Sequence, residues 1–155
     1  MRTRIFFALV FVTVAANAQV LQVRQYAAKF VCGKATDEQA ATFDVAPGSY
    51  FTTINVHNPA LRVDASFQKK FALAERDERP GKISEWFREA LKPDEALQID
   101  CGSIYKHLGL TPGTFIDGFA VIQTPNLRNQ LDVVGVYTTS AGSIHMERVP
   151  ARITQ

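Results

Sequence analysis

The chain has 155 residues, and its 17 Lys and Arg side chains nearly balance 15 Asp and Glu. This length accommodates one domain with a sizeable core. Two of the arginines lie in the first eighteen residues, so residues 19–155 carry 17 − 2 = 15 basic and 15 acidic side chains. No overall charge favours nucleic acid or an anionic lipid surface, and neither is expected as a partner.

The first eighteen residues have the order of a secretory signal peptide. Arg2 and Arg4 supply positive charge, residues 5–16 are apolar, and Ala16-Asn17-Ala18 is an A-x-A cleavage pattern. The apolar run is too short for a bilayer span, which needs roughly 20 residues. We expect residues 1–18 to be removed, residues 19–155 to form one domain, and the product to be periplasmic or secreted without membrane insertion.

The chain has two cysteines, Cys32 and Cys101. An exported protein meets an oxidising compartment, where such a pair most often forms one disulfide. Two buried free thiols or a redox pair are the alternatives, although no C-x-x-C spacing supports redox chemistry.

Short stretches that alternate apolar and polar residues, separated by turn signals, predict a β-rich domain. In chain order, strands are expected at residues 26–31, 50–56, 61–74, 96–101, 115–123, 131–138 and 143–149. Residues 19–25 are a loose start or a first edge strand, and the stretch after residue 149 is a short tail. The pattern favours an all-β fold, an antiparallel β-sandwich of seven to eight strands with one or two short helices.

The sequence also predicts the structure of several segments between these strands. Residues 33–44 are polar and predict a loop, whereas 75–82 contain Pro80-Gly81 and predict a hairpin tip or exposed loop. Residues 83–91 fit either a short helix capped by Ser84 or a strand. Residues 104–108 predict a short helix, for which Asp100 is a candidate cap.

Two strands carry predictions about direction. Leu61, Val63, Ala65 and Phe67 are expected on one face of the 61–74 strand, or of two strands with a bulge. For 115–123, the prediction places Phe115, Phe119 and Val121 toward the core and makes Asp117 a bulge or an edge. The opposite face, with Ile116, Ala120 and Ile122, is also apolar, which predicts a central strand. Residues 125–130 are expected to join 115–123 and 131–138 as a hairpin loop.

A set of short segments resembles a family of small exported bacterial domains that has no assigned activity. The segments are KFVCG (29–33), PGSY (47–50), INVHNP (54–59), LKPDEA (91–96), IDC (99–101), FIDGF (115–119), LDVVGVYT (131–138) and MERVP (146–150). They extend over nearly all of residues 19–155. The order of strands and proline turns is also similar to the sandwich of sensory-rhodopsin-transducer proteins. Neither resemblance implies catalytic residues.

The ionisable residues do not form a recognisable catalytic or metal motif. His57, His107 and His145 lie in different segments without H-x-H or H-x-x-x-H spacing. Asn55, His57 and Asn58 are interpreted as a strand exit whose Asn side chains bond local backbone, although His57 as a general base is the alternative. Asp100, Asp117 and Asp132 are assigned structural or solvent roles. No catalytic residue, metal or cofactor is expected.

Aromatic side chains supply the only candidate ligand site. Trp86, Phe87 and Tyr105 are proposed as a platform for sugar rings or peptides, although core packing is the commoner role of a lone Trp. The leading hypothesis is a non-catalytic exported domain that binds an envelope protein or stabilises an assembly, including a homo-oligomer. A carbohydrate-binding module using these aromatics and a hydrolase with a loop-borne site are the alternatives.

Overall fold

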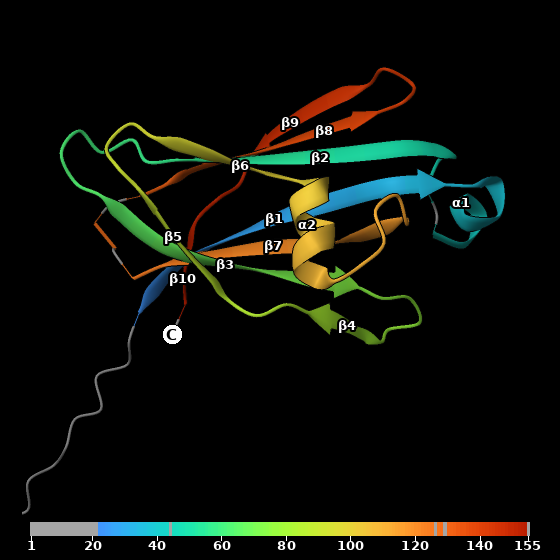
Figure 1. Cartoon of the computed structure of the whole chain (residues 1–155), viewed down its shortest axis with the longest axis horizontal. Helices are drawn as coiled ribbons and strands as arrows, with labels where there is room; N and C mark the ends of the chain where they lie inside the picture. Colours follow the sequence, from blue (N-terminus) through green and yellow to red (C-terminus); the bar gives the residue numbers. More distant parts are fainter. Residues whose placement is uncertain (1–21, 44, 126, 129, 155) are drawn as a thin grey trace, which may run out of the picture.

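The computed structural model describes residues 22–43, 45–125, 127–128 and 130–154, and the predicted signal peptide at 1–18 lies outside them. Within this part, strands and two short helices follow one another (Figure 1). The elements are β1 (Val23–Ala35), α1 (Asp37–Phe43), β2 (Gly48–His57), β3 (Ala65–Ala74), β4 (Pro80–Ile83), β5 (Phe87–Leu91), β6 (Ala96–Asp100), α2 (Cys101–Leu108), β7 (Ile116–Thr124), β8 (Asp132–Thr139), β9 (Ile144–Arg148) and β10 (Arg152–Thr154).

The strands form two layers that share β1. In sheet A, β3 pairs with β4 and β5 on one edge and with β7 on the other, and β7 pairs with β1. In sheet B, the order is β6-β2-β8-β9. The last three residues of β1 join β2, and β10 pairs with the start of β1. The pairings between named strands are all antiparallel, which confirms the predicted all-β class, with ten strands instead of seven or eight.

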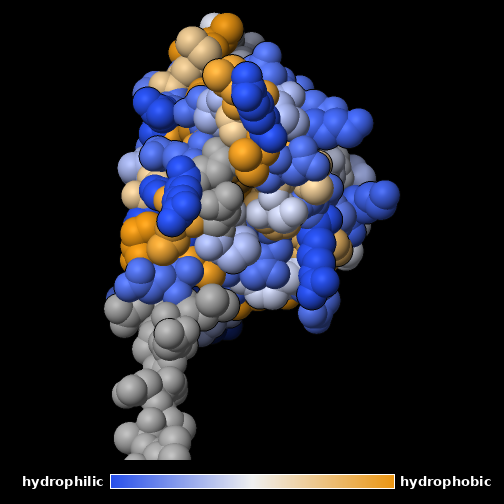
Figure 2. Space-filling model, turned by 90° about the vertical axis from the view of Figure 1, so that its left-hand side faces the viewer, coloured by the Kyte–Doolittle hydropathy of each residue, from blue (hydrophilic) through white to orange (hydrophobic). Residues whose placement is uncertain are grey.

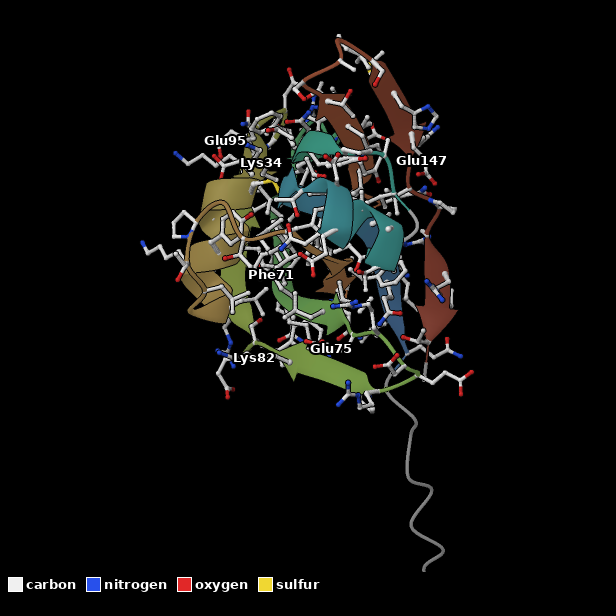
Figure 3. All side chains as sticks on the ribbon, turned by 90° about the vertical axis from the view of Figure 1, so that its right-hand side faces the viewer. Lys34, Phe71, Glu75, Lys82, Glu95 and Glu147 are labelled. Atoms are coloured by element: carbon white, nitrogen blue, oxygen red, sulfur yellow. A yellow bond between two sulfur atoms is a disulfide. The ribbon has the colours of Figure 1, made fainter. Side chains whose placement is uncertain are left out.

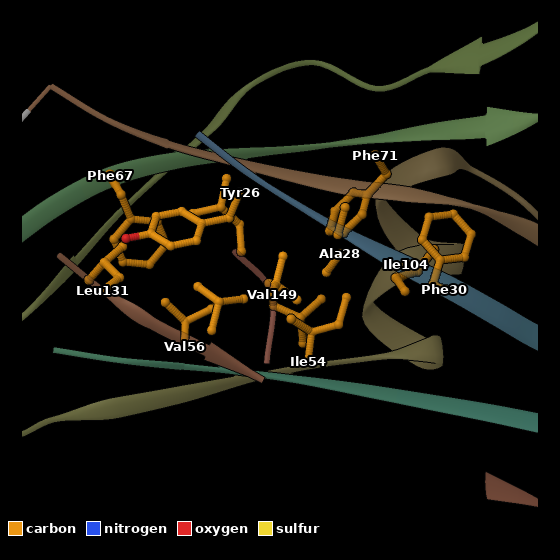
Figure 4. Close-up of a cluster of buried hydrophobic side chains, with 14 of the residues drawn as sticks. Tyr26, Ala28, Phe30, Ile54, Val56, Phe67, Phe71, Ile104, Leu131 and Val149 are labelled. Atoms are coloured by element: carbon orange, nitrogen blue, oxygen red, sulfur yellow. The ribbon is translucent and has the colours of Figure 1, made fainter. Parts of the chain in front are cut away.

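The core lies between the two layers (Figure 4). Inward side chains alternate along β1, where Tyr26, Ala28 and Phe30 are almost completely buried. They meet Ile54 and Val56 from β2 across the core. Because one face of each layer is buried, this alternation holds the register of the strands.

The junction where β1 passes from sheet A to sheet B is held by a side chain and a disulfide. The Thr52 hydroxyl accepts a hydrogen bond from the Val31 N–H and donates one to the Val31 carbonyl, each at 2.9 Å. Beside it, Cys32 and Cys101 are disulfide-bonded with their Cα atoms 5.7 Å apart, which confirms the predicted pairing. The end of β1 and the end of β6 therefore meet on the same edge of β2.

Helix α2 lies across one open side between the two layers (Figure 1). As predicted, Asp100 caps it, because its carboxylate accepts the Ser103 N–H at 2.7 Å. That hydrogen bond lowers the pKa of Asp100 below its ordinary value. At the other end, Gly109 adopts the left-handed conformation typical of a helix terminus. Lys82 of β4 donates to the Leu108 carbonyl at 2.6 Å, below the helix in Figure 3.

The prediction of a loop over 33–44 was wrong for most of that stretch. β1 continues to Ala35, and α1 follows after one residue. The Thr36 hydroxyl accepts the Gln39 N–H at 3.3 Å, and the Gln39 side chain accepts the Thr36 N–H at 3.1 Å. This reciprocal capping box starts a helix within a polar sequence. Ala40 then packs against Phe115 in a second, smaller core.

The predicted direction of β7 was also wrong, although its central position is confirmed. Ile116, Ala120 and Ile122 face the core, whereas Phe119 and Val121 lie on the outer face. Asp117 is neither a bulge nor an edge residue: it pairs regularly with Val31, and its carboxylate forms an ion pair with Lys29. Phe115 is buried, as expected, but in the second core.

Three connections also differ from their predictions. Residues 125–130 do not close a hairpin, because β7 and β8 belong to different layers. β3 begins at Ala65, and Leu61 is 89% exposed. The tail after residue 149 contains β10.

The structure of the region after β3 decides whether residues 83–91 form a helix or a strand. Residues 75–82 turn into β4, confirming the hairpin, and 87–91 form β5 rather than a helix. Ser84 does not cap a helix; its hydroxyl accepts the Phe71 N–H at 2.9 Å where β4 ends and β5 has not begun. Among the described residues, no helix is long and apolar enough to cross a membrane.

The Cys32→Ala/Cys101→Ala double variant tests the disulfide. The bridge spans 69 residues of sequence, and the chain-entropy model for a loop of this size predicts a loss of roughly 4 kcal/mol in the free energy of unfolding. Urea denaturation followed by circular dichroism measures it. An unchanged midpoint would contradict a stabilising bridge.

The Thr52→Val variant tests the junction separately. The new methyl group leaves the Val31 N–H and carbonyl without the hydroxyl, and the expected cost is about 2 kcal/mol. Thr53→Val, on the outer face of the same strand, is the matched control and should change stability by about 0.5 kcal/mol or less. Equal effects of the two variants in urea denaturation would refute this role for Thr52.

Candidate functional site

A groove of about 660 Å³ crosses the outer face of sheet A. Its polar lining includes Ser66 and Gln68 of β3, Arg88 of β5 and Gln123 of β7. Its apolar lining comes from Phe67, Ala90, Val23 at the start of β1 and Pro125 after β7. A volume of this size lies within the range of small-molecule sites, which is roughly 300–1,000 Å³.

The register of the strands aligns three of these side chains. Gln68 is the direct partner of Arg88 on one side and of Gln123 on the other. The three side chains consequently form one row across β5, β3 and β7. The Gln68 and Gln123 amides are 3.4 Å apart, so they can hydrogen-bond each other. A row of amide and guanidinium groups presents both donors and acceptors to a polar ligand.

Trp86 lies on the same outer face, two residues before Arg88. It is 36% exposed, and the Lys70 ammonium lies 4.6 Å from the centroid of its ring. Lys70 points away from the core between the inward residues Lys69 and Phe71. Trp86 does not line the groove itself but lies on the same face, beyond Arg88, which does.

The other two predicted ligand residues are not brought to this face. Phe87 is half-buried and its ring centroid is 3.9 Å from that of His107 on α2. Tyr105 is 4% exposed, and its hydroxyl donates to the Thr114 carbonyl at 2.6 Å. Burial raises the pKa of Tyr105. The structure thus separates Trp86 from Phe87 and Tyr105.

An ion pair lies behind the groove, on the inner side of β3 and β5. Lys69 is charged but occupies a core-facing position, where it is only 8% exposed. Its ammonium is 2.5 Å from the Glu89 carboxylate. Removing one partner of such a pair would leave a charge without compensation in a largely apolar environment. Glu89 also borders the groove, but its carboxylate is held by Lys69.

His107 covers this ion pair from α2. Its ring stacks on Phe71, with centroids 5.5 Å apart, as well as on Phe87. Burial lowers the pKa of His107, and the positive charges of Lys69 and Lys106 lower it further, against a smaller effect of Glu89. These effects favour the neutral form of His107, and its ring packs against Phe71 and Phe87.

His57 and His145 lie elsewhere, at separate positions on sheet B. His57 lies between two carboxylates, with its Nε2 3.0 Å from Asp94 and its Nδ1 3.6 Å from Asp132. Asp132 also pairs with Arg148 at 2.9 Å. His145 of β9 stacks on Tyr137. Among the described residues, no group of three or more His, Cys, Asp or Glu side chains has a geometry that could hold a metal ion.

Asn58 has the local bonding role predicted for the strand exit. It is completely buried, and its side-chain amide donates to the carbonyls of Val63, Leu91 and Lys92. Its side-chain oxygen accepts the Ala60 N–H at 3.2 Å. These bonds attach the 58–64 connection to the turn after β5.

Comparisons with known protein families, with curated proteins and with solved structures find no match to this chain. The resemblance to small exported bacterial domains therefore stays a prediction. The site has to be interpreted from its own chemistry.

Sequence reasoning proposed Trp86, which lies on the face of the groove but does not line it, and missed Gln68, Arg88 and Gln123. Their alternation with buried neighbours indicated outward side chains. No local signal indicated that β3 would separate β5 from β7 and align the three residues, because this depends on pairing between segments far apart in the chain.

The His107→Phe variant tests the environment of this histidine. A histidine whose folded pKa lies below its unfolded value destabilises the folded state as pH falls from the unfolded pKa, about 6.5, toward the folded one. The wild type should lose stability over this window, and the variant should lose less because Phe has no proton to bind. Urea denaturation between neutral and mildly acidic pH measures the difference.

Leu61→Ala is the control for that experiment, because Leu61 is 89% exposed and has no ionisable group. It should retain the wild-type pH dependence. If His107→Phe and the wild type lose stability in parallel, the lowered pKa of His107 is refuted.

Proposed function

We propose that this chain is an exported, non-catalytic domain that binds an envelope glycan in the outer groove of sheet A. The row formed by Arg88, Gln68 and Gln123 carries the proposal. The disulfide between Cys32 and Cys101 is compatible with a periplasmic or secreted protein, where oxidising conditions allow such bonds.

The chemistry of the groove favours a ligand rich in hydroxyl groups. Each glutamine amide both donates and accepts, as a sugar hydroxyl does, and Arg88 and Ser66 add further donors. The Lys69 ammonium holds the Glu89 carboxylate, so this acidic side chain does not act as an unpaired acid at the groove.

Trp86 supplies the apolar component that sugar recognition requires. The indole lies on the outer face, beside the row of polar groups, and is partly exposed. An aromatic ring can pack against the C–H face of a pyranose while neighbouring amides bond its hydroxyls. This arrangement supports a glycan over an extended apolar peptide.

The end of the molecule from which β1 starts has a mixed surface. Hydrophilic and hydrophobic side chains alternate over it without forming one continuous apolar face (Figure 2). A surface of this kind supports recognition by hydrogen bonds and a few apolar contacts, as expected for a polar ligand.

A glycan array followed by fluorescence titration tests this function. The chain contains a single Trp, so the intrinsic emission comes from Trp86, on the same face as the groove. A bound sugar should shift or quench that emission. Arg88→Ala and Gln68→Ala/Gln123→Ala should weaken binding about tenfold or more, equivalent to at least one lost hydrogen bond to a charged group or two neutral ones.

Phe51→Ala, on the exposed face of the other sheet, is the matched control and should bind like the wild type. Glycan affinity that the groove variants leave unchanged would refute this site. Conversion of the bound sugar into shorter products would replace the binding function with a hydrolase.

A further inference from the structure

β9 presents a free edge on sheet B. It is the last strand of its layer, beyond β8, and all five of its residues are exposed. In Figure 3 it lies at the margin of the molecule, next to the label of Glu147. An exposed edge strand offers unpaired N–H and C=O groups to another strand.

The register with β8 shows which backbone groups are free. Thr139 donates to the Ser143 carbonyl, and Val149 donates to the Val133 carbonyl, so these are hydrogen-bonded pairs. Such pairs alternate along an antiparallel ladder. Residues 145 and 147 therefore bond β8, whereas the N–H and C=O groups of Ile144, Met146 and Arg148 point away from it.

The sequence of β9 is complementary to itself in one antiparallel register. With Met146 opposite Met146 of a second copy, the three residues with free backbone groups meet one another. His145 of each copy then lies opposite Glu147 of the other, in the close, non-hydrogen-bonded position. If the second copy is shifted by two residues relative to the first, either His145 lies opposite His145 or Glu147 lies opposite Glu147. In both cases the His145–Glu147 pairs are lost.

The outer face of sheet B extends this complementarity. Phe51, Ile144 and Met146 are among its exposed apolar side chains, and Met146 is 69% exposed. Val136 lies between Thr53 and Met146 in the same row of the sheet. Pairing across Met146 would place the two apolar areas side by side on one continuous sheet.

We propose that two copies of this chain form a symmetric dimer by antiparallel pairing of their β9 strands, with His145 of each copy facing Glu147 of the other. The proposal is independent of the glycan groove, which lies on the other layer of the sandwich. Its partner is a second copy because the charge pattern and the direction of the free backbone groups agree in the same register.

Met146→Pro tests the backbone pairing. Proline removes an N–H that points away from β8, and it is tolerated at such positions of edge strands. The variant should be monomeric in sedimentation velocity at concentrations where the wild type is dimeric. Met146→Val keeps the N–H and an apolar side chain, and it should remain dimeric.

A charge exchange tests the register and is independent of whether the proline variant folds. His145→Glu and the double variant His145→Lys/Glu147→Lys should each weaken the homodimer about tenfold or more, because each places like charges opposite one another at two symmetric positions. An equimolar mixture of the two variants should dimerise again, since every pair then joins opposite charges.

Several outcomes would overturn the dimer. The first is a wild type that stays monomeric over the whole concentration series. The second is a dimer that Met146→Pro leaves intact. The third is a mixture of charge variants that fails to associate. Any one of these results would refute the proposal. Slow amide exchange at Ile144, Met146 and Arg148 in a monomer would assign the edge to a segment of the same chain and would also refute it.

Discussion

The structure depends on how β1 is shared between two layers. Over most of its length β1 pairs with β7, and only its last three residues pair with β2. Where the layers separate, the second edge of β1 has backbone groups that must be bonded if they are buried. Thr52 bonds both polar groups of Val31, and the Tyr137 hydroxyl donates to the Lys29 carbonyl at 3.1 Å. Side chains thus replace strand pairing at the point where the sandwich opens.

The disulfide stabilises the same junction covalently. Cys101 begins α2 directly after β6, and Cys32 lies near the end of β1, so the bridge connects both layers to the helix that closes the core. Ile104 and Leu108 of that helix can therefore pack against the core without a long connection. The outer faces of both sheets remain available for other contacts.

The two layers differ in chemistry on both their inner and their outer sides. On sheet A, the Lys69–Glu89 pair and the ring of His107 occupy the inner side of β3 and β5. The outward positions of these strands carry amides, a guanidinium and Trp86. On sheet B, the inner side is mostly apolar, and the outer side combines Phe51 and Met146 with a free edge. A polar groove and a strand edge can consequently serve different partners without competing.

The sequence by itself determined the β class, the disulfide, the cap of α2 and most strands, because these follow from local alternation, cysteine number and short-range hydrogen bonds. Trp86 was also identifiable as a ligand candidate. Local patterns could not decide which face of β7 is buried, because both faces are apolar and only the layer that covers Ile122 selects one. They could not place Tyr105 inside. The capping box of Thr36 and Gln39 that starts α1 is a local signal, but the sequence analysis missed it within a polar stretch. Only the tertiary structure aligned Gln68, Arg88 and Gln123 and left the edge of β9 unpaired, because both features arise from pairing between strands distant in the chain.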